Sequence, residues 1–85
     1  MNSRRFYICD NAYITVEHGL HGLWVLYSYR KPVACIADEG NGNYSFHRLW
    51  DGHSQSTTRH INKFREWFGM GPIYKKYWLA LYVEP

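Results

Sequence analysis

The stretch Ser54–Phe68, S-Q-S-T-T-R-H-I-N-K-F-R-E-W-F, decides the fold because it contains the clearest amphipathic helix in the chain. Three apolar residues, Ile61, Phe64 and Phe68, recur at helical spacing and define a face for burial against a sheet. The hydroxyl-bearing residues just before them suit the N-cap, where a side-chain oxygen accepts a hydrogen bond from a free backbone N–H. The candidates for that cap are Ser56, Thr57 and Thr58. The pattern predicts a helix over about residues 57–68.

The sequence also indicates where this helix ends and which residues lie on its outer side. Gly69 suits the left-handed position after the last turn, and Pro72 prevents the helix from continuing. His60 and Trp67 flank the apolar stripe. The outward-facing residues are Arg59, Asn62, Lys63 and Glu66.

The rest of the chain is typical of strands, because β-branched and aromatic residues dominate it. The predicted strands are Ala12–Glu17, Leu23–Tyr29, Val33–Ala37, Tyr44–Trp50 and Ile73–Val83. A helix over Tyr74–Leu81 is the alternative for the last of these, but its aromatic density favours a strand. Within Tyr44–Trp50, Tyr44, Phe46 and Arg48 alternate with Ser45, His47 and Leu49.

Glycine, proline and asparagine separate these runs. A turn is predicted at Gly19–Gly22, a bend at Arg30–Pro32 and a loop at Asp38–Asn43. The expected fold class is therefore α+β: a mostly antiparallel sheet of four to five strands with one amphipathic helix packed on one face. With 85 residues, the chain is expected to form a single domain over residues 1–85.

Composition bounds the function only loosely. The chain is 46% hydrophobic and 19% aromatic, which argues against disorder. Its net charge of +3 is mild. The cations gather late in the chain, where Arg59, Lys63, Arg65, Lys75 and Lys76 face only one acid, Glu66. Such a cluster fits a nucleic-acid partner or a solvated surface.

Two cysteines, Cys9 and Cys35, lie in strand-like surroundings and do not make a disulfide framework. We expect both to be reduced and buried. The first residues lack the apolar segment of a signal peptide, and no apolar run is long enough to span a membrane. These features predict a cytoplasmic protein.

The sequence gives little support for a catalytic or metal-binding site. His18 and His21 with one cysteine fall short of the paired spacing and four ligands of a zinc site. Cys35 sits in an apolar strand, where a thiol is inert. His53, His60 and Asn62 have the residue types of a His-Asn-His nuclease without an acidic metal ligand. We therefore expect no enzyme activity, no cofactor and no metal.

Two segments carry a resemblance to a known family. The run Tyr27–Ala34, Y-S-Y-R-K-P-V-A, precedes the run His53–Phe64, H-S-Q-S-T-T-R-H-I-N-K-F. Together they resemble a small uncharacterised phage or prophage protein domain, which has an S-Y-x-x-P-V-A strand and a Y-S-x-T-T-x-H-x-x-x-F helix start. The likeness covers roughly Leu23–Phe68. It departs from the pattern at His53, where the family has Tyr.

The resemblance implies phage kinship and a sheet-plus-helix fold, and it implies no enzymatic activity. For a phage-encoded chain, the expected location is the cytoplasm of the host cell. By analogy with other small phage proteins, the expected role is stoichiometric inhibition of a host protein or ribonucleoprotein complex, such as a defence system, in the manner of anti-CRISPR proteins. The alternative is a basic nucleic-acid-binding protein that uses the same cations and aromatic rings. A monomer or a homodimer is expected, the latter if the last strand is an exposed edge.

Aromatic anchors surrounded by cations would carry such binding. The expected partner-binding residues are Arg59, Lys63, Arg65, Trp67, Tyr74, Lys75, Lys76 and Tyr77.

Overall fold

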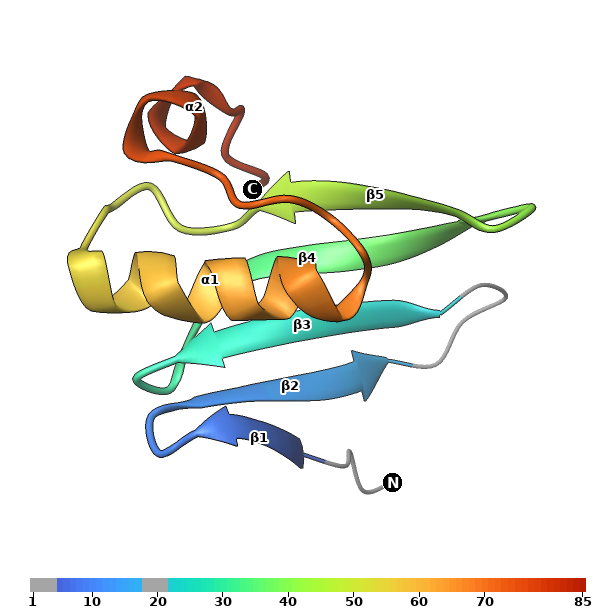
Figure 1. The fold of residues 1–85 in the computed structure, drawn as a ribbon, viewed down its shortest axis with the longest axis horizontal. Coiled ribbons are helices and arrows are strands. Elements are labelled where there is room, and N and C mark those ends of the chain that lie inside the picture. Colours follow the sequence, from blue (N-terminus) through green and yellow to red (C-terminus); the bar gives the residue numbers. More distant parts are fainter. Residues whose placement is uncertain (1–4, 18–21) are drawn as a thin grey trace.

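A computed structural model describes residues 5–17 and 22–85 of the chain. Its backbone forms a five-stranded sheet and two helices (Figure 1). The strands are β1 Arg5–Cys9, β2 Ala12–Glu17, β3 Leu23–Ser28, β4 Lys31–Gly40 and β5 Asn43–Arg48. Each strand pairs antiparallel with the next, in the order β1-β2-β3-β4-β5. The predicted α+β class with an antiparallel sheet is confirmed.

Four of the five predicted strands match β2 to β5 in position but are less accurate in length, and β1 was not predicted. Strand β2 has the predicted bounds, whereas β4 begins two residues before and ends three residues after the predicted Val33–Ala37. The predicted loop at Asp38–Asn43 is therefore a tight turn between β4 and β5. Gly40, Asn41 and Gly42 all take positive φ there. The predicted turn at Gly19–Gly22 lies almost entirely outside the described residues.

Helix α1 spans Gln55–Trp67, so it begins earlier than predicted. The N-cap is Ser54, whose side chain accepts a hydrogen bond from the Thr57 backbone N–H at 3.1 Å. The assignment of the cap to Ser56, Thr57 or Thr58 was therefore wrong. Polar Gln55 and Ser56 fill the first turn, so the apolar period starts only after it. The helix ends as expected, with Gly69 at φ 73°.

The predicted last strand, Ile73–Val83, is wrong. Residues Lys75–Ala80 form a short helix, α2, and Trp78 is its buried residue. Only Val83 joins the sheet, through an isolated parallel bridge to Arg48 at the end of β5. The edge that was expected to pair two copies is therefore absent from residues 73–83, and the edge strands of the described sheet are β1 and β5.

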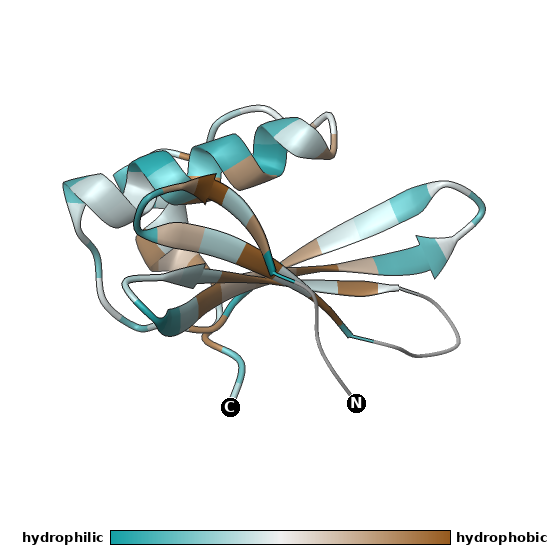
Figure 2. Ribbon diagram, turned by 90° about the horizontal axis from the view of Figure 1, so that it is seen from below, coloured by the Kyte–Doolittle hydropathy of each residue, from teal (hydrophilic) through white to brown (hydrophobic). Residues whose placement is uncertain are grey.

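Both faces of the sheet follow from the two-residue period of its strands. One face carries the apolar core and is covered by α1, while the other face is not covered by a helix in the described part of the chain (Figure 2). We call these the covered face and the open face. The core consists of Ala12, Ile14, Leu26, Val33, Ala34, Ile36, Ile61, Phe64, Ile73 and Trp78.

The apolar residues of α1 are buried as predicted, whereas only one of the two thiols is buried. Ile61 and Phe64 are buried as expected, and Phe68 packs against the core. Cys35 is buried, but Cys9 is exposed, so the expectation for Cys9 was wrong. Cys9 is the last residue of edge strand β1, where neighbouring strands cover one side only. Among the described residues, no helix is long and apolar enough to cross a membrane.

Candidate functional site

Seven of the eight predicted contact residues are exposed on the helices and their connection. Three of them are aromatic rings that are more than half exposed: Trp67 at 56%, Tyr74 at 64% and Tyr77 at 61%. The other exposed members are Arg59, Lys63, Lys75 and Lys76. We call these seven residues the helical-layer surface.

The first turn of α2 is the densest part of this surface. Four consecutive exposed residues, Tyr74 to Tyr77, place two lysines between two tyrosines. The turn is exposed because α2 has one inward anchor, Trp78, which is 2% exposed. The ammonium of Lys76 lies 6.0 Å from the centroid of the Tyr77 ring.

A shallow groove runs along the outer side of α1. Its volume is about 400 Å³, and it is lined by Arg59, Asn62, Lys63, Glu66, Met70 and Pro72. The segment after α1 is held there because Asn62 Oδ1 accepts a hydrogen bond from the Ile73 N–H at 2.8 Å. The lining therefore combines two apolar residues, Met70 and Pro72, with two cations, Arg59 and Lys63.

Arg65 differs from the other predicted contacts. Its Nε donates to the Gly71 carbonyl at 2.8 Å, and its guanidinium lies 4.6 Å from the centroid of the Phe46 ring. Partial burial lowers the pKa of Arg65, although an arginine stays protonated near neutral pH. Its geometry is that of a brace between α1, the following loop and β5.

The alternation of residues in β5 placed Arg48 on the correct face of the sheet, but it did not indicate the role of this side chain. It is 4% exposed and lies on the covered face. Its guanidinium donates to the carbonyls of Trp50, Asp51, Trp78, Leu79 and Leu81, at 2.7–3.4 Å. It also lies 4.8 Å from the centroid of the Trp78 ring. This buried cation satisfies carbonyls at the end of α2 and thereby holds the short helix against the sheet.

A buried polar cluster joins α1 to β3. Ser28 Oγ lies 2.9 Å from Thr57 Oγ1 and 2.8 Å from His60 Nδ1. All three side chains are buried. Burial, followed by the charge of Arg59, lowers the pKa of His60, so the imidazole is neutral at neutral pH. The cluster explains the T-T-R-H motif: Thr57 and His60 orient the helix, as expected for a buried histidine with its hydrogen bond satisfied.

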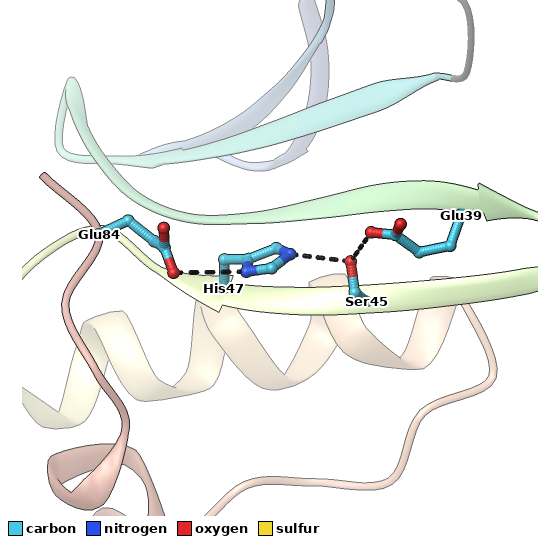
Figure 3. A network of polar contacts seen from close by, with 4 residues as sticks. All are labelled: Glu39, Ser45, His47 and Glu84. Atoms are coloured by element: carbon cyan, nitrogen blue, oxygen red, sulfur yellow. Dashed lines mark hydrogen bonds and ion pairs between the residues drawn. The ribbon is translucent and has the colours of Figure 1, made fainter.

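A second polar cluster lies on the open face, at the β4–β5 end of the sheet (Figure 3). Ser45 donates its hydroxyl proton to Glu39 and also lies 2.8 Å from His47 Nε2. His47 Nδ1 lies 3.6 Å from Glu84, which follows the bridge of Val83 to the sheet. The residue types are those of a Ser-His-acid triad. However, a nucleophilic serine gives its proton to histidine, whereas Ser45 gives its proton to Glu39.

The thiols and metal-ligating groups make no site of their own in the described residues. Burial, followed by the charge of Glu84, raises the pKa of Cys35 and keeps it a thiol. No group of three or more His, Cys, Asp or Glu residues there is placed to hold a metal ion. His18 and His21, which were considered as zinc ligands, lie outside the described residues.

One protein family of unknown function matches the chain over residues 1–80. The chain belongs to the DUF8033 family. That family is described as one of unknown function, so membership assigns no reaction, ligand or partner. No curated protein and no solved structure matches the chain.

Proposed function

We propose that this protein is a non-catalytic binding protein that occludes a partner protein with its helical-layer surface. The observation that carries the proposal is the exposed Tyr74–Tyr77 turn, in which two aromatic rings flank two lysines. Aromatic rings are enriched at protein interfaces, where they act as anchors in the buried centre of the contact. Leaving such rings in water is unfavourable unless a partner covers them.

Charge indicates the chemistry of the partner. Arg59, Lys63, Lys75 and Lys76 are exposed, and Glu66 is the only acid between residues 56 and 76. Electrostatic complementarity therefore favours an acidic protein surface. The groove beside α1 would accept an apolar side chain of that partner between Met70 and Pro72, with Arg59 and Lys63 also in the lining.

The biological setting of the proposal comes from the phage resemblance. Under that proposal, the partner is a host complex, and the protein blocks a defence system by covering its surface in a one-to-one complex. The exposed cations equally support a second candidate, a basic nucleic-acid-binding protein. That candidate requires binding to weaken steeply with salt, because phosphate contacts release counterions.

A plating assay tests the inhibitor proposal. Bacteria that carry an active CRISPR system and express this protein should be infected by a targeted phage at least 100-fold more efficiently than cells with an empty vector. The double variant Lys75→Glu and Lys76→Glu should abolish this gain. Lys31→Glu, which reverses an exposed cation at the start of β4, is the control and should retain it.

Purification of the tagged protein from host cells, with and without nuclease, tests the wider binding proposal. One protein should be retained stoichiometrically by the wild type and by Lys31→Glu, but not by the Lys75→Glu and Lys76→Glu variant. Retention that disappears with nuclease would replace this proposal with the nucleic-acid candidate. Equal retention by both variants would exclude the helical-layer surface.

A further inference from the structure

Two hairpin turns meet at one end of the sheet and enclose a groove of about 670 Å³. One turn contains Asp10 and Asn11, between β1 and β2, and the other contains Tyr29 and Arg30, between β3 and β4. A hydrogen bond of 2.8 Å from the Tyr29 N–H to the Asn11 carbonyl joins the two turns. The volume of this groove lies within the roughly 300–1,000 Å³ typical of small-molecule sites.

Two of the aromatic rings that line this groove, Tyr7 and Tyr13, belong to a row of three tyrosines on the open face. Tyr7, Tyr13 and Tyr27 occupy opposite positions on β1, β2 and β3. The rings of Tyr13 and Tyr27 are stacked, with centroids 5.0 Å apart and planes 7° apart, and the Tyr7 ring lies 5.3 Å from Tyr13. Two rings of the lining are largely exposed, Tyr7 at 59% and Tyr29 at 54%. Each of these two rings can receive a further aromatic plane.

Two arginines face the same groove. The Arg5 guanidinium lies 4.7 Å from the centroid of the Tyr13 ring, and Arg30 lines the opposite turn. A hydrogen bond with Tyr7 is the main cause that raises the pKa of Arg5. Asp10 is the single acid in the lining, so the two arginines leave the groove net positive. Asn11, with both an amide donor and a carbonyl acceptor, can hydrogen-bond the polar edge of a ligand.

The backbone supplies an independent reason to regard this end of the sheet as functional. Tyr29 has φ 52° and Arg30 has φ 67°, a conformation that large side chains rarely adopt. Two-residue hairpin turns of this kind favour Asn-Gly. Strained residues of this sort cluster at ligand sites, and here the strain presents one aromatic ring and one guanidinium to the groove.

We propose that this groove binds a nucleotide unit, an aromatic base that carries phosphate. The base would stack on Tyr7 or Tyr29, the phosphate would contact Arg5 or Arg30, and Asn11 and Asp10 would contact the polar edges of the base or sugar. Aromatic stacking beside arginine is how single-stranded nucleic acids are held without a fixed sequence. The unit can come from a free mononucleotide or from a single-stranded chain. The proposal is independent of the helical-layer surface.

Fluorescence anisotropy with a labelled 12-nucleotide oligo-dT or oligo-U, and NMR titration with UMP and AMP, test the proposal on the full chain. The single-stranded probes should bind, and a duplex of the same length should bind at least tenfold more weakly because its bases cannot stack. Arg30→Gln and Tyr7→Ala should each weaken binding about tenfold, within the range measured for the loss of one stacked base. Lys31→Gln, which removes a neighbouring exposed cation outside the lining of the groove, is the control and should change binding less than twofold.

The outcomes separate cleanly. Shifts of groove residues by mononucleotides identify a nucleotide pocket, whereas binding of oligonucleotides alone identifies a single-strand site, and either result supports the proposal. Equal affinity for duplex and single strand would overturn it, as would equal losses for Arg30→Gln and Lys31→Gln. The proposal would also be overturned if neither the oligonucleotides nor UMP and AMP bind at millimolar concentration. Tyr7 is exposed on an edge strand, and an unchanged thermal melt of Tyr7→Ala would show that the variant is folded.

Discussion

Two serine–histidine pairs lie on opposite faces of the same sheet, and their surroundings give them different roles. On the covered face, Ser28 bridges Thr57 and His60 in a fully buried cluster. On the open face, Ser45 bridges Glu39 and His47, and His47 lies against Glu84, all within reach of solvent. The chemistry of the pairs is similar, but a buried hydrogen bond has no water to replace it. Stability should therefore depend on the covered face, whereas the open face is free to change.

The same division applies to the cations. Arg48 on the covered face is buried among carbonyls, while Arg59, Lys63, Lys75 and Lys76 are exposed on the outer side of the helices. The first is required by the fold, and the others are available to a partner. A protein that binds through its surface needs this separation, because the contact residues can then change without loss of the fold.

Loss of the buried arginine should give the largest effect. Arg48→Met keeps most of the side-chain volume but leaves several carbonyls without a donor, each of which costs about 1–3 kcal/mol when buried. We expect a decrease of about 3 kcal/mol in the free energy of unfolding, measured by urea denaturation. Arg59→Met is the matched control and should stay within about 0.5 kcal/mol of the wild type. Equal effects of the two substitutions would contradict the assigned role of Arg48.

The two serines provide the direct test of the comparison. Ser28→Ala should lower the free energy of unfolding by about 2 kcal/mol, because Thr57 and His60 both lose a buried partner. For a domain of this size, that corresponds to a decrease of roughly 10 °C in the melting temperature. Ser45→Ala should cost less than about 1 kcal/mol, since water can replace the lost hydroxyl. A larger loss for Ser45→Ala would reverse the proposed difference between the faces.

The division into faces could be predicted from sequence where a single strand or helix encodes it. The alternation in β5 placed Arg48 with Phe46 and opposite His47, and the period of α1 identified Ile61 and Phe64. Helix α2 could not be predicted, because six residues are too short to show a period and tyrosine and tryptophan favour strands. Its conformation depends on Arg48, about thirty residues earlier, and on the burial of Trp78.

The candidate sites were likewise predictable only where their residues lie close together in the sequence. The exposed cations and rings of the helical layer were predicted because they lie close together in the sequence. Arg65 was grouped with these exposed residues because the sequence does not show that the loop after α1 folds back and accepts a hydrogen bond from Arg65 at Gly71. The nucleotide groove was missed because it joins two turns that meet only in the folded sheet, at Asn11 and Tyr29. A Tyr-Arg pair where a tight turn would favour Asn-Gly was the one available signal.

His60 makes the covered face sensitive to acid. Its pKa is below the usual value of 6.5, so the folded protein takes up a proton less readily than the unfolded chain does. The stability contributed by neutral His60 is therefore present above pH 6.5 and is lost as the pH falls through the lower folded pKa. Urea denaturation at pH 7.5 and pH 5.0 should show a larger decrease for the wild type than for His60→Gln. We expect this difference to be smaller than the effect of Ser28→Ala. Parallel decreases would show that His60 is not the group responsible.

Relief of the strained turn should stabilise the protein. Replacement of Tyr29 and Arg30 by Asn and Gly removes two large side chains from positive φ, a conformation that costs roughly 1–2 kcal/mol per residue. The contact between the Tyr29 and His60 rings, whose centroids are 5.6 Å apart, is lost at the same time. We expect a net gain of about 1 kcal/mol in thermal or urea denaturation, together with weaker binding of the single-stranded probe. A loss of stability would mean that the ring contact outweighs the strain.

The smallest effect should come from the ion pair on the open face. His47 and Glu84 are 34% and 41% exposed, and the chain at Glu84 is also held by its backbone N–H, which donates to the Arg48 carbonyl at 2.8 Å. A double-mutant cycle with His47→Gln and Glu84→Gln should therefore give a coupling energy of about 0.5 kcal/mol or less, since exposed pairs contribute little. The coupling should disappear in 1 M salt, where the Debye length is only about 3 Å. A coupling above about 2 kcal/mol that persists in salt would show that the open-face cluster behaves like a buried one, and the contrast with Ser28, Thr57 and His60 would then fail.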